Sequence, residues 1–221
     1  MTTLFVGLLF GLLQGLRHAF EPDHVVAIST MIGEQRSSRV RIAYAAAWGM
    51  GHAAMLTLVG GVLMFLRAEL PPRLDAGFEL AVSLMLIGLG VRAVLAAVRE
   101  AISSNVVASR SQFPVHLHRP WRGIGPLAMG MVHGLAGSGA LTALVVARLP
   151  SPIVGLAFMV VFGAGATLGM SLLAGVAGVP LAHVLRRKWG VPALLGATGS
   201  LSLALGIAWV VPAALHFARA G

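Results

Sequence analysis

The chain of 221 residues contains no cysteine. Disulfides and thiolate ligands are therefore excluded, so any metal ion must be held by nitrogen, oxygen or thioether donors. Charge is scarce as well, because Asp, Glu, Lys and Arg make up 10% of the residues, whereas 57% are hydrophobic. These proportions lie outside the range of soluble globular domains and are typical of polytopic membrane proteins. We therefore expect an integral membrane protein.

Several catalytic signatures are also missing. No P-loop, HExxH, CxxC or GxSxG motif occurs, so the sequence offers no machinery for nucleotide hydrolysis, zinc proteolysis, dithiol exchange or serine esterase chemistry. We do not expect an enzyme. The net charge of +9 lies mostly in short loops between apolar segments, where basic residues act as topology signals. We therefore do not expect nucleic acid as a partner.

Six apolar segments are each long enough to cross a bilayer, which takes about 20 residues. They cover residues 3–28, 42–66, 76–98, 124–147, 152–179 and 191–216. The expected fold is an all-α integral membrane protein with six transmembrane helices. Lys and Arg gather in the loops after the first, third and fifth segments, and the positive-inside rule places those loops in the cytoplasm. We expect a multi-pass protein of the cell (inner) membrane with both termini outside the cytoplasm.

An internal repeat emerges when the chain is slid against itself by about 115 residues. GLRH at 15–18 falls opposite GMVH at 130–133, WGMG at 48–51 opposite FGAG at 162–165, and LGV at 89–91 opposite LGI at 205–207. Three spans match three spans, and an odd number of crossings per unit makes the copies inverted, as in many secondary transporters. The expected organisation is a first three-helix repeat at 1–98, a cytoplasmic linker loop at 99–123 and a second repeat at 124–221. A substrate site is expected near the pseudo-twofold axis.

Five ionisable side chains interrupt the first apolar segment, in GLRHAFEPDHVVAIST at 15–30. They are Arg17, His18, Glu21, Asp23 and His24. A charged side chain at the bilayer centre costs about 2.5 to 3.5 kcal/mol on insertion scales, so several together indicate a functional site. Arg17 and Glu21 are four residues apart, and we expect them to pair and support the site. The alternative is that these groups only hold the span to its neighbours through hydrogen bonds.

Pro22 decides how these groups are arranged. In an unbroken helix the step from His18 to His24 gives roughly 9 Å of rise and about 120° of rotation, so the two imidazoles could not share an ion. Pro22 has no N–H, and its ring clashes with the carbonyl of His18. We predict that the span is kinked or broken at Pro22, which lets His18, Asp23 and His24 converge. Neutral imidazoles and a carboxylate suit a divalent transition metal.

Further histidines lie in two other apolar segments. In WGMGHAAM at 48–55, Gly49 and Gly51 allow close helix approach, so His52 could complete the metal site. The alternative for His52 is a hydrogen bond to a neighbouring carbonyl. In GMVHGLAGSGALTAL at 130–144, His133 is either a further ligand or a supporting group that orients one. His116 and His118, in the long loop, either capture metal in the cytoplasm or are solvated bystanders.

The motif H-x4-D-H, formed here by His18, Asp23 and His24 in RHAFEPDH, resembles the signature of the nickel/cobalt transporter family. LRHAFEPDHVVAIST, together with WGMGH and MVHGLAGSGAL, is similar to the urease accessory protein H-like (UreH-like) membrane proteins. The resemblance implies metal recognition by His18, Asp23 and His24, and it matches His52 to the histidine of the next family motif. The chain departs from the family where Glu-Pro replaces the usual Asp-Ala, where the acidic LGxDTATE-type motif is missing, and where six spans replace eight.

Together these features predict a membrane permease for a divalent transition-metal ion, first Ni²⁺ and second Co²⁺. The metal is the transported substrate, and no permanently bound cofactor is expected. The resemblance implies a role in metalloenzyme maturation such as that of urease, with a metallochaperone or urease maturation proteins as partners. Two alternatives stay open. One is a proton-coupled exporter of a small solute, and the other is a membrane metalloenzyme or assembly factor that binds metal without transporting it.

Overall fold

The computed structural model describes residues 2–32, 37–68, 70–106, 124–136, 151–184 and 189–219. In these ranges all regular secondary structure is helical, which confirms the predicted all-α class. The helices are α1 (Thr2–His18), α2 (Pro22–Ile32), α3 (Ser38–Leu66), α4 (Pro72–Val106), α5 (Ile124–Leu135), α7 (Pro152–Val184) and α8 (Gly190–Arg219).

Four of these helices, α3, α4, α7 and α8, are long and apolar enough to cross a membrane. The predicted span 3–28 is divided into α1, with 17 residues, and α2, with 11 residues. The predicted span 124–147 begins with α5, which has 12 residues, and continues outside the described residues. The membrane character is therefore carried by four helices, and the count of six spans stays a prediction. Helix α4 continues to Val106, so its last turns lie inside the range 99–123 that the sequence assigned to the linker loop.

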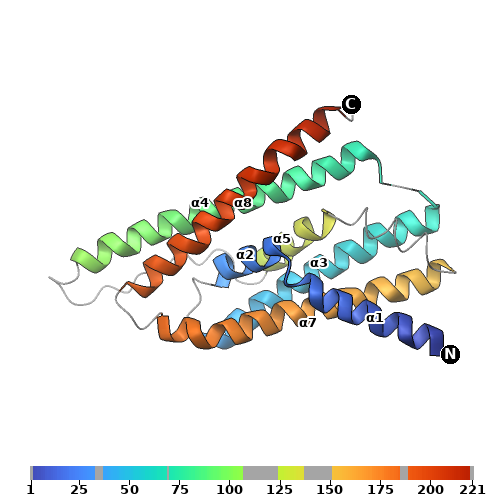
Figure 1. Cartoon of the computed structure of the whole chain (residues 1–221), viewed down its shortest axis with the longest axis horizontal. Helices are drawn as coiled ribbons and strands as arrows, with labels where there is room; N and C mark the ends of the chain where they lie inside the picture. The colour runs from blue at the N-terminus through green and yellow to red at the C-terminus, as the bar shows by residue number, and fades with distance from the viewer. Residues whose placement is uncertain are drawn as a thin grey trace.

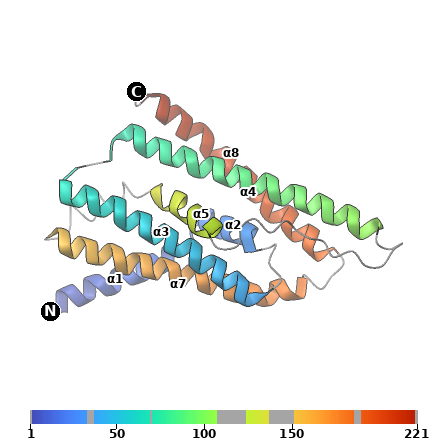
Figure 2. The same ribbon diagram turned by 180° about the vertical axis from the view of Figure 1, so that it is seen from behind.

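The helices form two groups (Figure 1). Helices α1, α7, α3 and α5 lie side by side in that order, and α4 and α8 pack against each other as a separate pair. The short helix α2 touches both groups, because it contacts α8 and α4 as well as α7 and α3. Seen from behind in Figure 2, α2 and α5 lie between the α4 and α8 pair and the layer that contains α3 and α7. Both termini lie toward the same end of the long axis (Figure 1).

The crossing of α1 with α7 is a contact between backbones. A Cβ at Gly15 would overlap the carbonyl oxygen of Phe162, and a Cβ at Gly165 would overlap that of Leu12. Small residues allow this approach, and in an apolar environment close packing is a main source of helix association. Gly15 of α1 and Gly165 of α7 therefore fix where the two helices cross.

The crossing of α3 with α5 has the same construction. A Cβ at Gly130 would overlap the carbonyl oxygen of Trp48, and a Cβ at Gly51 would overlap that of Leu127. These positions match those of the first crossing in the sequence alignment of the two halves, with Gly130 opposite Gly15 and Trp48 opposite Phe162. The contacts between α3 and α5 thus correspond, position by position, to the contacts between α7 and α1.

Helix α2 is the most enclosed of the short helices. Ala27 and Ile28 are fully buried in the main apolar cluster, which also contains Trp48 and Leu86. The hydroxyl of Thr30 donates a hydrogen bond to the carbonyl of Val26 at 2.8 Å. This packing holds the first turn of α2 inside the helix bundle.

Candidate metal site

The first apolar segment is not one continuous helix, because it is interrupted between α1 and α2. The Phe20 N–H donates to the carbonyl of Arg17 at 2.9 Å, and the Glu21 N–H donates to the carbonyl of His18 at 3.0 Å. Such bonds between residues three apart tighten the last turn of a helix and end it. Pro22 is then the first residue of α2, a position where its missing N–H costs nothing. The predicted break at Pro22 is confirmed.

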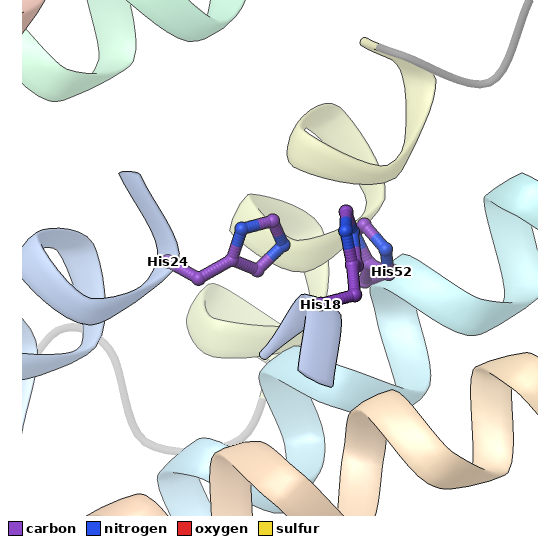
Figure 3. A group of neighbouring side chains, drawn as sticks. All are labelled: His18, His24 and His52. Atoms are coloured by element: carbon purple, nitrogen blue, oxygen red, sulfur yellow. The ribbon is translucent and has the colours of Figure 1, made fainter. Parts of the chain in front are cut away.

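The break brings three imidazoles together (Figure 3). The ring centroids of His18 and His24 are 4.5 Å apart, and the ring of His52 lies 5.2 Å from His18 and 5.1 Å from His24. His24 and His52 are buried, and His18 is partly exposed. The predicted convergence of these side chains is therefore present, while their role as metal ligands stays a prediction.

A second group of donors surrounds Asp23. One carboxylate oxygen accepts a hydrogen bond from Nε2 of His133 at 2.7 Å, and the other lies 3.1 Å from Nδ1 of His24. The ring centroids of His24 and His133 are 4.3 Å apart. Asp23 and His133 are both buried, although they are 110 residues apart in sequence. The carboxylate at the start of α2 therefore joins the two halves of the chain.

Several buried ring nitrogens have no hydrogen-bond partner among the described residues. They are Nε2 of His24, Nδ1 of His133 and both ring nitrogens of His52. A buried polar atom left unpaired costs about 1 to 3 kcal/mol, so such atoms call for a ligand or an ordered water. His18, His24 and His52 form one group of three potential metal donors, and Asp23, His24 and His133 form another. In each group the ligand atoms lie within 4.8 Å of one another.

Glu21 pairs with His18 and not with Arg17, which corrects our expectation. Oε1 of Glu21 lies 3.0 Å from Nδ1 of His18. The four-residue spacing predicted a pair between Arg17 and Glu21, but that geometry requires a continuous helix. The chain leaves the helix after His18, so Glu21 turns back toward the imidazole while Arg17 stays exposed. Glu21 therefore occupies Nδ1 of His18.

Two aromatic side chains that pack against the histidine cluster were not predicted from the sequence. The ring of Phe162 lies 5.3 Å from that of His18, and the ring of Trp48 lies 5.5 Å from that of His133. Both pairs occupy matching positions in the two halves, so the alignment of WGMG with FGAG contained the signal. His116 and His118 lie outside the described residues.

Comparison with known proteins agrees with the motifs. The chain is 29% identical over 206 residues to urease accessory protein UreH of Bacillus sp. (strain TB-90). The alignment covers 90% of this chain and 88% of that protein. The predicted resemblance to the UreH-like proteins is confirmed. The chain is also 28% identical over 180 residues to Chloroplast protein FOR GROWTH AND FERTILITY 1 of Arabidopsis thaliana, covering 77% of this chain and 48% of that protein. No family model matches the chain, and no solved structure matches it significantly.

Proposed function

We propose that the chain is a membrane permease for a divalent transition-metal ion, with Ni²⁺ as its first substrate and Co²⁺ as its second. The observation that carries this proposal is the cluster at the break between α1 and α2, where four imidazoles gather and two of them, those of His24 and His133, contact the carboxylate of Asp23. The likeness to UreH, a urease accessory protein by name, supports delivery of the ion to metalloenzyme maturation, such as that of urease.

The donor set favours a metal ion over a proton as the cargo. A proton relay requires a continuous chain of hydrogen bonds, whereas His52 has no hydrogen-bond partner for either ring nitrogen among the described residues. Imidazole nitrogens with one carboxylate suit Ni²⁺, Co²⁺, Cu²⁺ and Zn²⁺. Because affinity alone favours Cu²⁺ in that series, the preference for Ni²⁺ has to come from coordination geometry and metal availability.

The two halves form inverted repeats in this proposal, at 1–98 and 124–221, with six membrane crossings. The matching backbone contacts of α1 with α7 and of α5 with α3 support it. The pair of α4 and α8 adds a third match, because Gly90 approaches the carbonyl of Gly199 and Gly206 approaches that of Ser83. His18 and His133 occupy equivalent positions in the two halves and flank His24. This arrangement puts the site near the pseudo-twofold axis, where transporters of this plan bind substrate.

The membrane potential supplies enough energy for uptake. Two elementary charges moving down an inside-negative potential gain about 4.6 kcal/mol per 100 mV, which is a concentration factor above a thousand. The proposal places the chain in the cell (inner) membrane with both termini outside the cytoplasm. A metallochaperone or urease maturation protein then receives the ion on the cytoplasmic side.

The test is ⁶³Ni²⁺ flux into proteoliposomes that contain the purified full chain. We expect uptake that rises with an inside-negative potential and is inhibited more by Co²⁺ than by Mn²⁺. His216→Ala is the matched control, because His216 is an exposed histidine of α8 that lies beside Glu79, outside the cluster. Absence of flux above protein-free liposomes, with the chain folded and inserted, would refute the permease and favour a scaffold or an enzyme that retains its metal.

A further inference from the structure

The cluster contains two groups of three donors that share one residue. His24 belongs both to the group with His18 and His52 and to the group with Asp23 and His133. We refer to the first as the triple-histidine site and to the second as the aspartate site. A metal ion in either site would have a nitrogen of His24 as a ligand.

The two edges of the His24 ring face different sites. Nδ1 lies 3.1 Å from a carboxylate oxygen of Asp23. Figure 3 shows the other ring nitrogen directed toward His18 and His52, and this Nε2 atom has no hydrogen-bond partner among the described residues. The imidazole is therefore placed to offer one nitrogen to each site.

The two sites differ in access and in origin. The side chain of His18 is 23% exposed, whereas that of His133 is 2% exposed. The triple-histidine site therefore includes a partly exposed donor on α1, while the donors of the aspartate site are buried and include His133 of α5. His18 and His133 are also equivalent positions of the two halves. Each site thus contains His24 and one member of this equivalent pair.

Charge allows only one site to be filled at a time. The aspartate site has one carboxylate among its donors, and the donors of the triple-histidine site are three imidazoles. Two doubly positive ions a few ångströms apart would repel each other strongly in a buried environment, and a single carboxylate cannot compensate them. The sites are therefore alternatives for one ion.

We propose that Asp23, His24 and His133 form a second metal site, to which Ni²⁺ passes from the site of His18, His24 and His52. This inference rests on the proposed function and extends it. In the step, the ion loses its bonds to His18, to His52 and to Nε2 of His24. It gains bonds to a carboxylate oxygen of Asp23, to Nε2 of His133 and to Nδ1 of His24. The hydrogen bonds that now join Asp23 to the two imidazoles are replaced by metal bonds. The proton on Nδ1 of His24 moves to the Nε2 atom that the ion has left, and the proton on Nε2 of His133 moves to Nδ1 of the same ring. Both rings therefore stay neutral, and no net proton is gained or lost.

The test separates the two sites by removing one private ligand from each. His52→Ala disables the triple-histidine site, and His133→Ala disables the aspartate site. Each full-length variant is purified in detergent and loaded with Ni²⁺ alone, and X-ray absorption spectroscopy counts its imidazole ligands. We expect about one Ni²⁺ per chain in each variant. Two imidazoles with a carboxylate are expected after His52→Ala, and three imidazoles after His133→Ala. Flux should fall at least about tenfold in both.

The outcomes separate this inference from the proposed function. If both variants give the same ligand set, or if folded His52→Ala binds no Ni²⁺, the second site does not exist. If the ligand sets differ as expected while the wild type gives no flux, the two sites stand and the permease is wrong. Where an alanine variant does not fold, His52→Gln and His133→Gln keep much of the side-chain volume and serve the same comparison. His216→Ala should match the wild type in ligand set and flux.

Discussion

The crossing of α1 with α7 and the crossing of α3 with α5 pack alike but carry different chemistry. In each, a glycine of the shorter helix lies against a carbonyl of the longer one, and an aromatic ring of the longer helix covers a histidine. After His18, however, the chain continues with the acids and the proline of FEPDH, whereas GLA follows His133. The backbone arrangement is shared between the halves, and the charged groups are confined to one.

This difference separates the residues that position the cluster from those that we propose as metal ligands. The glycine contacts place His18 and His133 at equivalent points beside His24. Pro22 then ends the helix in the first half, and the new helix brings Asp23 and His24 between them. Substitutions at the matching glycines of the two halves should therefore lower the stability of the protein by similar amounts. Substitutions near Pro22 should lower its affinity for the metal ion and leave its stability unchanged.

The largest effect is expected from His24→Ala. His24 belongs to both donor groups, so its loss leaves two donors in each and should weaken Ni²⁺ binding by more than about a hundredfold. Equilibrium binding of ⁶³Ni²⁺ to the purified chain measures this. Near-native affinity in the folded His24→Ala variant would show that His24 is not a ligand and would contradict both donor groups.

The matching crossings should respond alike to a single methyl group. Gly15→Ala and Gly130→Ala each push a Cβ into a backbone carbonyl of the facing helix, and overpacking of this kind costs about 1 to 3 kcal/mol. Thermal unfolding in detergent measures the loss of stability. We expect the two variants to be destabilised by similar amounts.

Gly88→Ala is the matched control for these variants. A Cβ at Gly88 meets nothing within 4 Å, so alanine should be neutral or stabilise α4 by about 0.5 to 1 kcal/mol. A large loss of stability for Gly15→Ala together with none for Gly130→Ala would contradict the equivalence of the two crossings.

A smaller effect is expected from Pro22→Ala. Alanine restores the N–H and removes the ring that opposes a continuous helix. Inside a helix, alanine is favoured over proline by about 3 kcal/mol. Burial of Ala27 and Ile28 still holds α2 in place, so we expect Ni²⁺ affinity to fall by about tenfold while the fold is kept. Isothermal titration calorimetry measures the change. Pro72→Ala, at the first position of α4, should leave affinity unchanged, and equal losses in both variants would argue against a specific role for the break.

The smallest effect is expected from Glu21→Gln. Glu21 is 55% exposed and holds Nδ1 of His18 at 3.0 Å, so the amide should weaken Ni²⁺ binding by only about three- to tenfold through poorer orientation of the imidazole. The same titration measures it. Glu79→Gln, which alters the carboxylate beside His216, is the control. An unchanged affinity for Glu21→Gln would mean that the carboxylate does not orient His18.

Much of the fold could be predicted from apolar segments and from one proline. The segment 42–66 corresponds to α3 and 191–216 to α8, because burial in an apolar environment selects continuous hydrophobic runs. Helix ends were less predictable. α4 continues past the apolar segment through Arg99 and Glu100, since both residues favour helices and hydropathy does not report on polar turns.

The candidate site was predictable only where its residues are close in sequence. The convergence of His18 and His24 could be predicted from Pro22, because a proline changes a helix only near its own position. The bond between His133 and Asp23 depends on how α5 lies against α2, and no sequence spacing reports that distance. The pairing of Glu21 with His18 was missed because the exact residue at which α1 ends decides which side chain Glu21 meets.

The central claim is that a break in the first span gathers imidazoles around a transported metal ion. An experimental structure of the full chain in Ni²⁺, with anomalous scattering at the nickel edge, tests it most directly. We predict one nickel peak at about 2.0 to 2.2 Å from a ring nitrogen of His24, with the chain leaving the helix between His18 and Pro22. A continuous helix through this segment, or a nickel peak only at another site such as His216, would contradict the account.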